Sequence, residues 1–260
     1  MKILSKLLVF FIICNLGRLV AQSQVPHNII PQPVSVRSAP GNLKLLELKQ
    51  IIIPKKSIEF RNLAEYIKNS LNMPDLKIIE SKSPSLGKTK SIVISLLTSE
   101  KNKDNYALNI NKNGILINAE DSKGAFYAIQ SVLQLSELSD VGSIPFYIIE
   151  DESEFKYRGM HLDVSRHFFS VSFIKLYIDL LARYKLNTFH WHLTDDQGWR
   201  IEIKKYPLLT GIGSKRKESI LDKHFEPYLG DNTPVEGYYT QDQIADVIKY
   251  AALRHVSIVP

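Results

Sequence analysis

The sequence predicts an α/β protein in which a small α+β unit is followed by a region of parallel βα units. In the first half, short β-branched runs alternate with two helical stretches. After residue 154 the order becomes strand, helix, strand, helix, strand, which is typical of right-handed βα connections and a parallel sheet. With 23% charged residues, 44% hydrophobic residues, 12 glycines and 12 prolines in 260, the composition is that of a folded globular protein.

The first 23 residues have the organisation of a signal peptide. Lys2 and Lys6 precede an apolar run from Leu7 to Cys14, and a less apolar stretch leads to the small residue Ala21. The run is too short to span a bilayer comfortably. We therefore predict an exported protein, periplasmic or extracellular, with no membrane span after cleavage. The alternatives are a buried N-terminal helix and, with bulky residues ahead of the cysteine arguing against it, a lipid anchor.

Cysteine and charge exclude several classes of function. Cys14, the only cysteine, lies in the predicted signal, so the remaining chain uses neither disulfides nor thiolate chemistry and depends on its core for stability. The net charge of +6 falls by three when the basic residues of the signal leave. The basic run Lys215–Lys217 is interpreted as a solvated loop, and no nucleic-acid partner is expected.

The predicted α+β unit, residues 24–151, contains two helices, at residues 58–71 and 123–138. Asn113 and Gly114 favour a tight hairpin because both tolerate positive φ. Since no catalytic constellation occurs here, we interpret the unit as a supporting domain. Its predicted strands are residues 51–53, 78–79, 92–96, 106–110 and 115–118.

The second region, residues 152–260, has strands predicted at 157–164, 187–192 and 257–259. Ser172 is the expected cap of the first helix, whose apolar stripe is Phe173, Tyr177, Leu180, Leu181 and Tyr184. Thr240 and Gln243 form a capping box before the second helix, whose apolar face is Ile244, Val247, Ile248 and Ala251. More than forty residues separate the second strand from this helix, which indicates a functional excursion.

Two polar clusters follow the first two strands of this region, where a parallel α/β barrel binds its ligands. The first comprises Asp163, Arg166 and His167, and the second His190, His192, Asp195, Asp196, Gln197 and Trp199. Arg166 presents a planar fork that fits two vicinal sugar hydroxyls or a carboxylate, and an ion pair to Asp163 or Asp195 is the equally weighted alternative. Asp195 and Asp196 are also suited to accept hydrogen bonds from loop amides.

The two histidines share one side of their strand, because side chains alternate with a period of two. With an aspartate they suggest a metal site, but core histidines bonded to neighbours are commoner, so no metal is predicted. Trp191 is expected to pack in the core, whereas Trp199 lies in the loop and suits either packing or a sugar.

Two runs, Tyr157–Phe168 (YRGMHLDVSRHF) and Lys185–Arg200 (KLNTFHWHLTDDQGWR), with the later Gly237–Thr240 (GYYT), resemble the β-N-acetylhexosaminidases of glycoside hydrolase family 20. The segments Gly124–Ala128 and Gln130–Leu135 resemble the small domain that precedes the catalytic barrel in that family. The resemblance covers nearly all of the chain after the predicted signal. It implies an N-terminal domain followed by an incomplete (β/α)8 TIM barrel with about three strands present.

The resemblance implies an exo-acting retaining enzyme that removes terminal N-acetylhexosamine, with the substrate's own 2-acetamido oxygen as nucleophile. Arg166 would bind the C3 and C4 hydroxyls, and Asp195 would join a network to the general acid. His192, Asp196, Asp163 and Trp199 would support these two residues. The implied partner is an N-acetylhexosamine-containing glycan, and no cofactor is expected.

The family's adjacent Asp and Glu, which orient the acetamide and protonate the leaving oxygen, follow a later barrel strand. We expect this pair beyond Pro260 and so no catalytic residue within the chain. About 250 residues make a closed barrel. We therefore expect an inactive fragment that associates through an open sheet edge. A non-catalytic glycan-binding module and a metal hydrolase built on His190 and His192 are the competing interpretations.

Overall fold

The computed structural model describes residues 28–97, 104–137 and 142–260. The predicted signal peptide lies outside these residues. No helix within the described part of the chain is long and apolar enough to cross a membrane.

A seven-stranded mixed sheet forms the first region, in the order β1-β7-β5-β6-β4-β2-β3. All five predicted strands are present, and β5 and β6 form the predicted hairpin. Only Gly114 of the predicted turn pair has a positive φ, of 134°, so the prediction for Asn113 was wrong. The strands are β1 (Ser35–Lys44), β2 (Gln50–Pro54), β3 (Lys77–Ser81), β4 (Ser91–Leu96), β5 (Tyr106–Asn111), β6 (Gly114–Ala119) and β7 (Ser143–Asp151).

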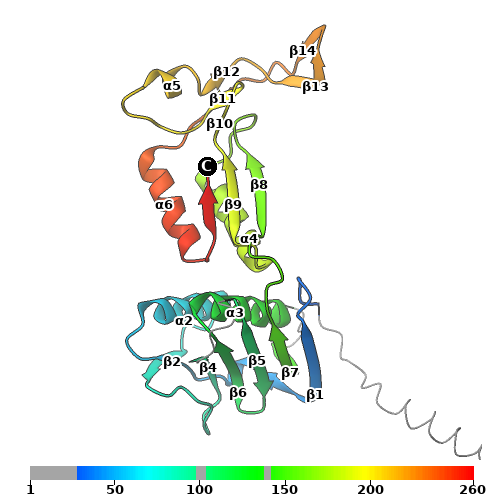
Figure 1. The fold of residues 1–260 in the computed structure, drawn as a ribbon, viewed down its shortest axis with the longest axis vertical. Helices are drawn as coiled ribbons and strands as arrows, with labels where there is room; N and C mark the ends of the chain where they lie inside the picture. Colours follow the sequence, from blue (N-terminus) through cyan, green and yellow to red (C-terminus); the bar gives the residue numbers. More distant parts are fainter. Residues whose placement is uncertain (1–27, 98–103, 138–141) are drawn as a thin grey trace, which may run out of the picture.

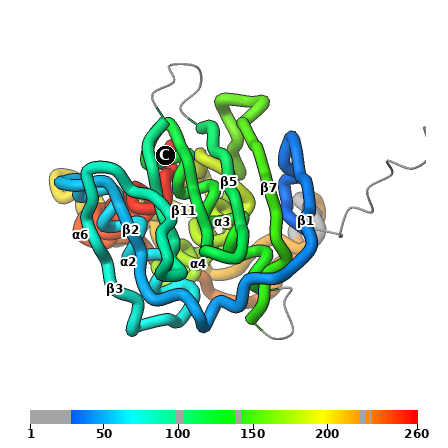
Figure 2. Tube along the Cα trace, turned by 90° about the horizontal axis from the view of Figure 1, so that it is seen from below, coloured from blue at the N-terminus to red at the C-terminus, as the bar shows by residue number. Residues whose placement is uncertain are grey.

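Helices α2 (Ile58–Ser70) and α3 (Ser122–Glu137) pack on one face of this sheet, and a short 3-10 helix (η1, Leu45–Glu47) follows β1. Figure 1 shows both helices between the sheet and the second region, and Figure 2 shows the molecule from below, with the strands of the sheet in front. Because α3 is covered on both sides, Phe126 and Ile129 are fully buried together with Tyr127 and Gln130. The helix is therefore buried nearly all round rather than along one stripe.

The second region is built on a three-stranded parallel sheet, in the order β16-β9-β8. The strands are β8 (Gly159–Asp163), β9 (Thr188–His192) and β16 (Ser257–Val259), close to the three predicted positions. In Figure 1 their carboxyl ends point away from the first region and toward residues 193–240. This mixed α/β architecture agrees with the predicted fold class, in which an α+β unit is followed by a region with a parallel sheet.

Helices α4 (Val171–Arg183) and α6 (Gln241–Ala252) pack together beside this sheet. The capping box of Thr240 and Gln243 is confirmed. The cap of α4 is Ser170 instead of Ser172, because the Ser170 hydroxyl accepts from the Phe173 amide. The predicted stripe of α4 was also wrong, since its buried face is Ile174, Ile178, Leu181 and Ala182, and only Leu181 belongs to both sets. On α6, Val247 and Ala251 are buried, but Ile248 is exposed.

Residues 193–240 contain only short elements, which lie beyond the carboxyl ends of β8 and β9 (Figure 1). Arg216 corrects the prediction of a solvated basic run, because its half-buried guanidinium donates to backbone carbonyls. The elements are β10 (Thr194–Asp195), β11 (Gly198–Trp199), α5 (Leu208–Gly211), β12 (Lys215–Arg216), β13 (Ile220–Phe225), β14 (Tyr228–Gly230) and β15 (Val235–Glu236).

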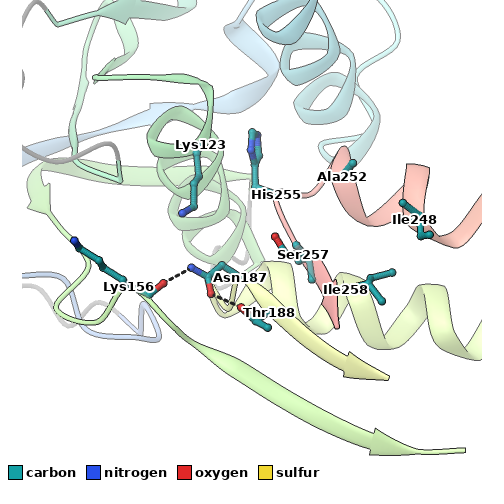
Figure 3. A pocket seen from close by; sticks show the side chains of 10 residues that line it. Lys123, Lys156, Asn187, Thr188, Ile248, Ala252, His255, Ser257 and Ile258 are labelled. Atoms are coloured by element: carbon teal, nitrogen blue, oxygen red, sulfur yellow. Dashed lines mark hydrogen bonds between the residues drawn. The ribbon is translucent and has the colours of Figure 1, made fainter. Parts of the chain in front are cut away.

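The two regions meet through polar contacts that cross from α3 and the sheet to the loops before β8 and β9. Lys185 Nζ lies 2.8 Å from Asp151 Oδ2 and 2.8 Å from the Tyr106 hydroxyl. Arg158 donates to Tyr127 Oη at 2.9 Å. A cavity of about 660 Å³ opens beside these contacts, and Figure 3 shows its wall, where Asn187 Nδ2 donates to the Lys156 carbonyl.

Candidate functional site

Arg166 lies in the loop after β8 and is held by two carboxylates, one at the end of β8 and one in β10. Its Nη1 is 3.0 Å from Asp163 Oδ2 and 2.6 Å from Asp195 Oδ2. Asp163 Oδ1 also accepts from the amides of Ser165 and Arg166, which fixes the loop where the strand ends. The Arg166 side chain remains 41% exposed. Arg166 therefore forms the ion pairs that were the alternative to ligand binding, and its side chain is nevertheless partly exposed to solvent.

The pKa values of both carboxylates of this cluster are lowered. Burial raises the pKa of Asp163, but backbone amides and the Arg166 guanidinium outweigh it, so the pKa lies below the usual 3.8. The pKa of Asp195 is also lowered, first by the Asp196 amide and then by Arg166. The two carboxylates in turn raise the pKa of Arg166 against the opposing effect of burial. The cluster thus combines one permanent cation with two anions.

His192 extends the cluster from the end of β9. Its Nε2 lies 3.2 Å from Asp195 Oδ2, and its Nδ1 lies 3.3 Å from Nε2 of His161. Sequence reasoning did not select His161. The signal was present, because His161 precedes Asp163 by two positions on one strand and therefore shares its face.

His190 and His192 do lie on one side of β9, as predicted, and their rings stack with centroids 6.1 Å apart. The His190 ring also meets the His161 ring edge-on at 4.8 Å. Across residues 28–97, 104–137 and 142–260, no group of three metal-ligating side chains is placed to hold a metal ion. The geometry of these rings is that of packing and hydrogen bonding.

The two tryptophans occupy different environments. Trp191 is fully buried and packs edge-on against Tyr239 with centroids 4.6 Å apart, which confirms its predicted place in the core. Trp199 is half-buried, and its Nε1 donates to the Ile201 carbonyl at 2.7 Å. It lines a largely apolar groove of about 890 Å³ together with Asp195 and Asp196, so the three predicted residues share one surface.

Two further arginines hold the loops on which the cluster depends. Arg200 is fully buried and donates to the carbonyls of Val164 and Ser165, at 3.0 and 2.8 Å, and of Ser214 and Gly237. Arg216 donates to the Gln197 carbonyl at 2.7 Å and to the Arg166 carbonyl. Each guanidinium donates hydrogen bonds to several segments. Residues 193–240 are therefore held against the ends of β8 and β9.

A smaller cavity of about 230 Å³ adjoins Arg166 and is lined by His167, Gln197 and Glu218, among others. The buried Oε1 of Gln197 has no hydrogen-bond partner in the described part of the chain. The residues that line this cavity include both donors and acceptors of hydrogen bonds.

The fold and this cluster define the class of protein: an α/β protein with a cluster of charged and polar side chains at the carboxyl ends of parallel strands. Comparison with known families identifies it further. Glycosyl hydrolase family 20, domain 2, matches residues 26–152, and Glycosyl hydrolase family 20, catalytic domain, matches residues 155–260. The chain belongs to glycoside hydrolase family 20.

The chain is also similar to individual proteins and solved structures. A β-hexosaminidase of Porphyromonas gingivalis is 36% identical over 255 residues, which are 92% of this chain and 31% of that protein. An N,N'-diacetylchitobiase of Vibrio harveyi is 31% identical over 92% of this chain and 27% of its own length. The crystal structure of a family 20 exo-β-N-acetylglucosaminidase from Vibrio harveyi with N-acetylglucosamine has a TM-score of 0.73 at 31% identity, covering 92% of this chain and 37% of that chain. The chain thus spans about a third of the length of these relatives.

Proposed function

We propose that the chain supplies the sugar-binding part of an exo-β-N-acetylhexosaminidase, which removes terminal non-reducing N-acetylhexosamine from glycans. In this proposal the parallel sheet is the first part of a (β/α)8 barrel, and β8 and β9 present the site at its carboxyl end. The single observation that carries the proposal is the Arg166 guanidinium, fixed by Asp163 and Asp195 and still open to a ligand.

The hydrogen-bonding capacity of Arg166 supports a hydroxyl ligand. Its contacts with Asp163 and Asp195 both use Nη1, and no bond of Nε or Nη2 occurs among the described residues. A guanidinium has five N–H groups in a planar fork, so the remaining edge is available to two neighbouring oxygens. Vicinal hydroxyls such as C3 and C4 of a pyranose fit that edge.

The chemistry that we propose is substrate-assisted retention, in which the substrate's 2-acetamido oxygen attacks its own anomeric carbon. Such a reaction needs a proton donor for the leaving oxygen. Asp163 and Asp195 are unsuited to this role because their pKa values are lowered. We assign them to holding Arg166, and the resemblance assigns proton donation to the glutamate of an adjacent Asp–Glu pair on a later barrel strand.

Binding of N-acetylglucosamine to the chain tests the proposal. Arg166→Ala should weaken the affinity by about ten-fold or more, because hydrogen bonds to a charged group are worth about 1.5–3 kcal/mol. Arg37→Ala is the matched control, since Arg37 also lies in an exposed ion pair but on the first region. Titration followed by ligand-observed NMR gives both affinities. Equal affinity in wild type and Arg166→Ala would contradict the proposal.

A non-catalytic glycan-binding module is the second candidate, favoured by the ionised state of both site carboxylates. An aryl N-acetylglucosaminide separates the two functions. Turnover that Arg166→Ala abolishes indicates the hydrolase, whereas sugar binding without turnover indicates the module.

We also propose that the protein acts outside the cytoplasm, supported by the basic start, apolar middle and small-residue end of residues 1–23. Expression in a bacterium followed by fractionation and N-terminal sequencing tests this. Retention in the cytoplasm with an uncleaved N-terminus would contradict it.

A further inference from the structure

His161 begins a continuous line of polar contacts that ends at Arg166. His161 Nε2 lies 3.3 Å from His192 Nδ1, and His192 Nε2 lies 3.2 Å from Asp195 Oδ2. The same Asp195 oxygen lies 2.6 Å from Arg166 Nη1. Each ring nitrogen of His192 therefore faces a different partner.

The strand register explains why these groups meet. β8 and β9 are parallel, with His161 opposite His190 and Asp163 opposite His192. Side chains two positions apart share a face, so both pairs lie on the same side of the sheet. The Tyr177 hydroxyl on α4 donates to the His161 carbonyl at 3.1 Å and fixes the backbone at this position.

The donor and acceptor roles along this line depend on two carboxylates and on His161. Asp195 Oδ2 lies 3.2 Å from Nε2 of His192 and Asp163 Oδ2 lies 4.0 Å from Nδ1, so a carboxylate, which only accepts hydrogen bonds, lies near each ring nitrogen. An Nε2–H of His161 that faces Nδ1 at 3.3 Å makes Nδ1 the acceptor and leaves the proton of the neutral ring on Nε2. A partner on one ring nitrogen sets both the tautomer and the orientation of the other nitrogen.

We propose that His161 is a positioning residue, which holds His192 in the Nε2–H tautomer aimed at Asp195 and thereby steadies the Asp195–Arg166 pair. Its effect on ligand affinity rests on the proposed sugar-binding function. Its effect on His192 does not, because the tautomer is a property of the unliganded chain.

The first test is the tautomer of His192 in the full chain labelled with ¹⁵N-histidine, read from the imidazole nitrogen shifts. The wild type should show His192 protonated on Nε2 and unprotonated on Nδ1. His161→Leu should lose this single state, whereas His161→Gln should keep it, because a glutamine amide still offers an N–H donor. His255→Asn is the control, since His255 lines the cavity at the boundary between the two regions, which we call the seam.

The second test is the affinity for N-acetylglucosamine. We expect His161→Leu to weaken it about five-fold, the usual size of one lost hydrogen bond, and His161→Gln to restore most of it. A neutral wild-type His192 protonated on Nδ1, or an unchanged tautomer in His161→Leu, would overturn the proposal. The wild-type measurement decides this even if His161→Leu fails to fold. A tautomer that depends on His161 in a chain with no sugar affinity would support the positioning role and refute the proposed function.

Discussion

Two clusters of cations and carboxylates, at opposite ends of the second region, differ in exposure. At the seam, Lys185 meets Asp151 with side chains only 5% and 12% exposed, and the Tyr106 hydroxyl bonds both. At the strand ends, Arg166 meets Asp195 with side chains 41% and 30% exposed. Ion pairing alone therefore does not separate a structural cluster from a binding site.

What separates the clusters is whether the charged groups keep free hydrogen-bonding capacity. Burial lowers the pKa of Lys185, although Asp151 opposes the shift, so this charge depends on its partner. Arg166 instead has an open edge toward solvent and a raised pKa. A substitution in the first cluster should act on stability, and one in the second on ligand binding.

Asp151→Asn should produce the largest effect. Removing one partner of a buried pair leaves an uncompensated charge, which costs about 3–5 kcal/mol of unfolding free energy. The double variant Asp151→Asn with Lys185→Met should recover much of this loss, because no buried charge remains. Urea denaturation measures both values.

Glu150→Gln is the neighbouring control, because Glu150 forms an exposed ion pair with Arg37. Its loss should be below about 1 kcal/mol. Equal losses for Asp151→Asn and Glu150→Gln would mean that the buried pair is not what joins the two regions.

Asp163→Asn should leave the fold nearly intact and damage binding. The asparagine Oδ1 still accepts from the amides of Ser165 and Arg166, so we expect a stability change within about 1 kcal/mol. The side-chain NH2 group that replaces Oδ2 carries no charge to attract the guanidinium. The affinity for N-acetylglucosamine should therefore fall about ten-fold. Calorimetric titration and urea denaturation of the same sample check the two effects. A large stability loss with unchanged affinity would reverse the assignment of the cluster.

In the first region the sequence predicted five of the seven strands and missed β1 and β7. β1 contains a proline and a glycine with a register shift between Ala39 and Asn42, and β7 contains Pro145. Both residue types argue against a strand when only local pattern is considered. Partner strands decided their structure, and those partners are distant in sequence.

For the candidate site, strand-end position was enough to bring Arg166, Asp163, Asp195 and His192 together in the prediction. Arg216 and His161 were missed for different reasons. Arg216 sits in a basic run typical of a solvated surface, and only the fold of residues 193–240 aims it at two distant carbonyls. Alternation along β8 places His161 on the face of Asp163, but its contact with His192 depends on the register between β8 and β9, which the sequence does not specify.

Acid titration should produce the smallest effect and compares the carboxylates of both clusters. Asp104 lies 2.8 Å from Lys123 Nζ and 3.3 Å from Arg158 Nη1 at the seam. Burial raises its pKa, but Lys123 and Arg158 outweigh burial, so its pKa falls below 3.8, and Asp163 shifts in the same direction. A lowered folded-state pKa adds stability above pH 3.8 that is lost as the pH falls through the folded value.

The unfolding free energy should therefore decrease as the pH falls below about 4, and Asp104→Asn should remove about 1 kcal/mol of that decrease. Asp163→Asn should remove less, because the Asp163 side chain is more exposed and its pairing with Arg166 is screened by solvent. Urea denaturation of the wild type and both variants at pH 7 and pH 3 measures the two differences. A greater loss of acid dependence in Asp163→Asn than in Asp104→Asn would place the stronger structural pairing at the strand ends, against the division of roles drawn from exposure.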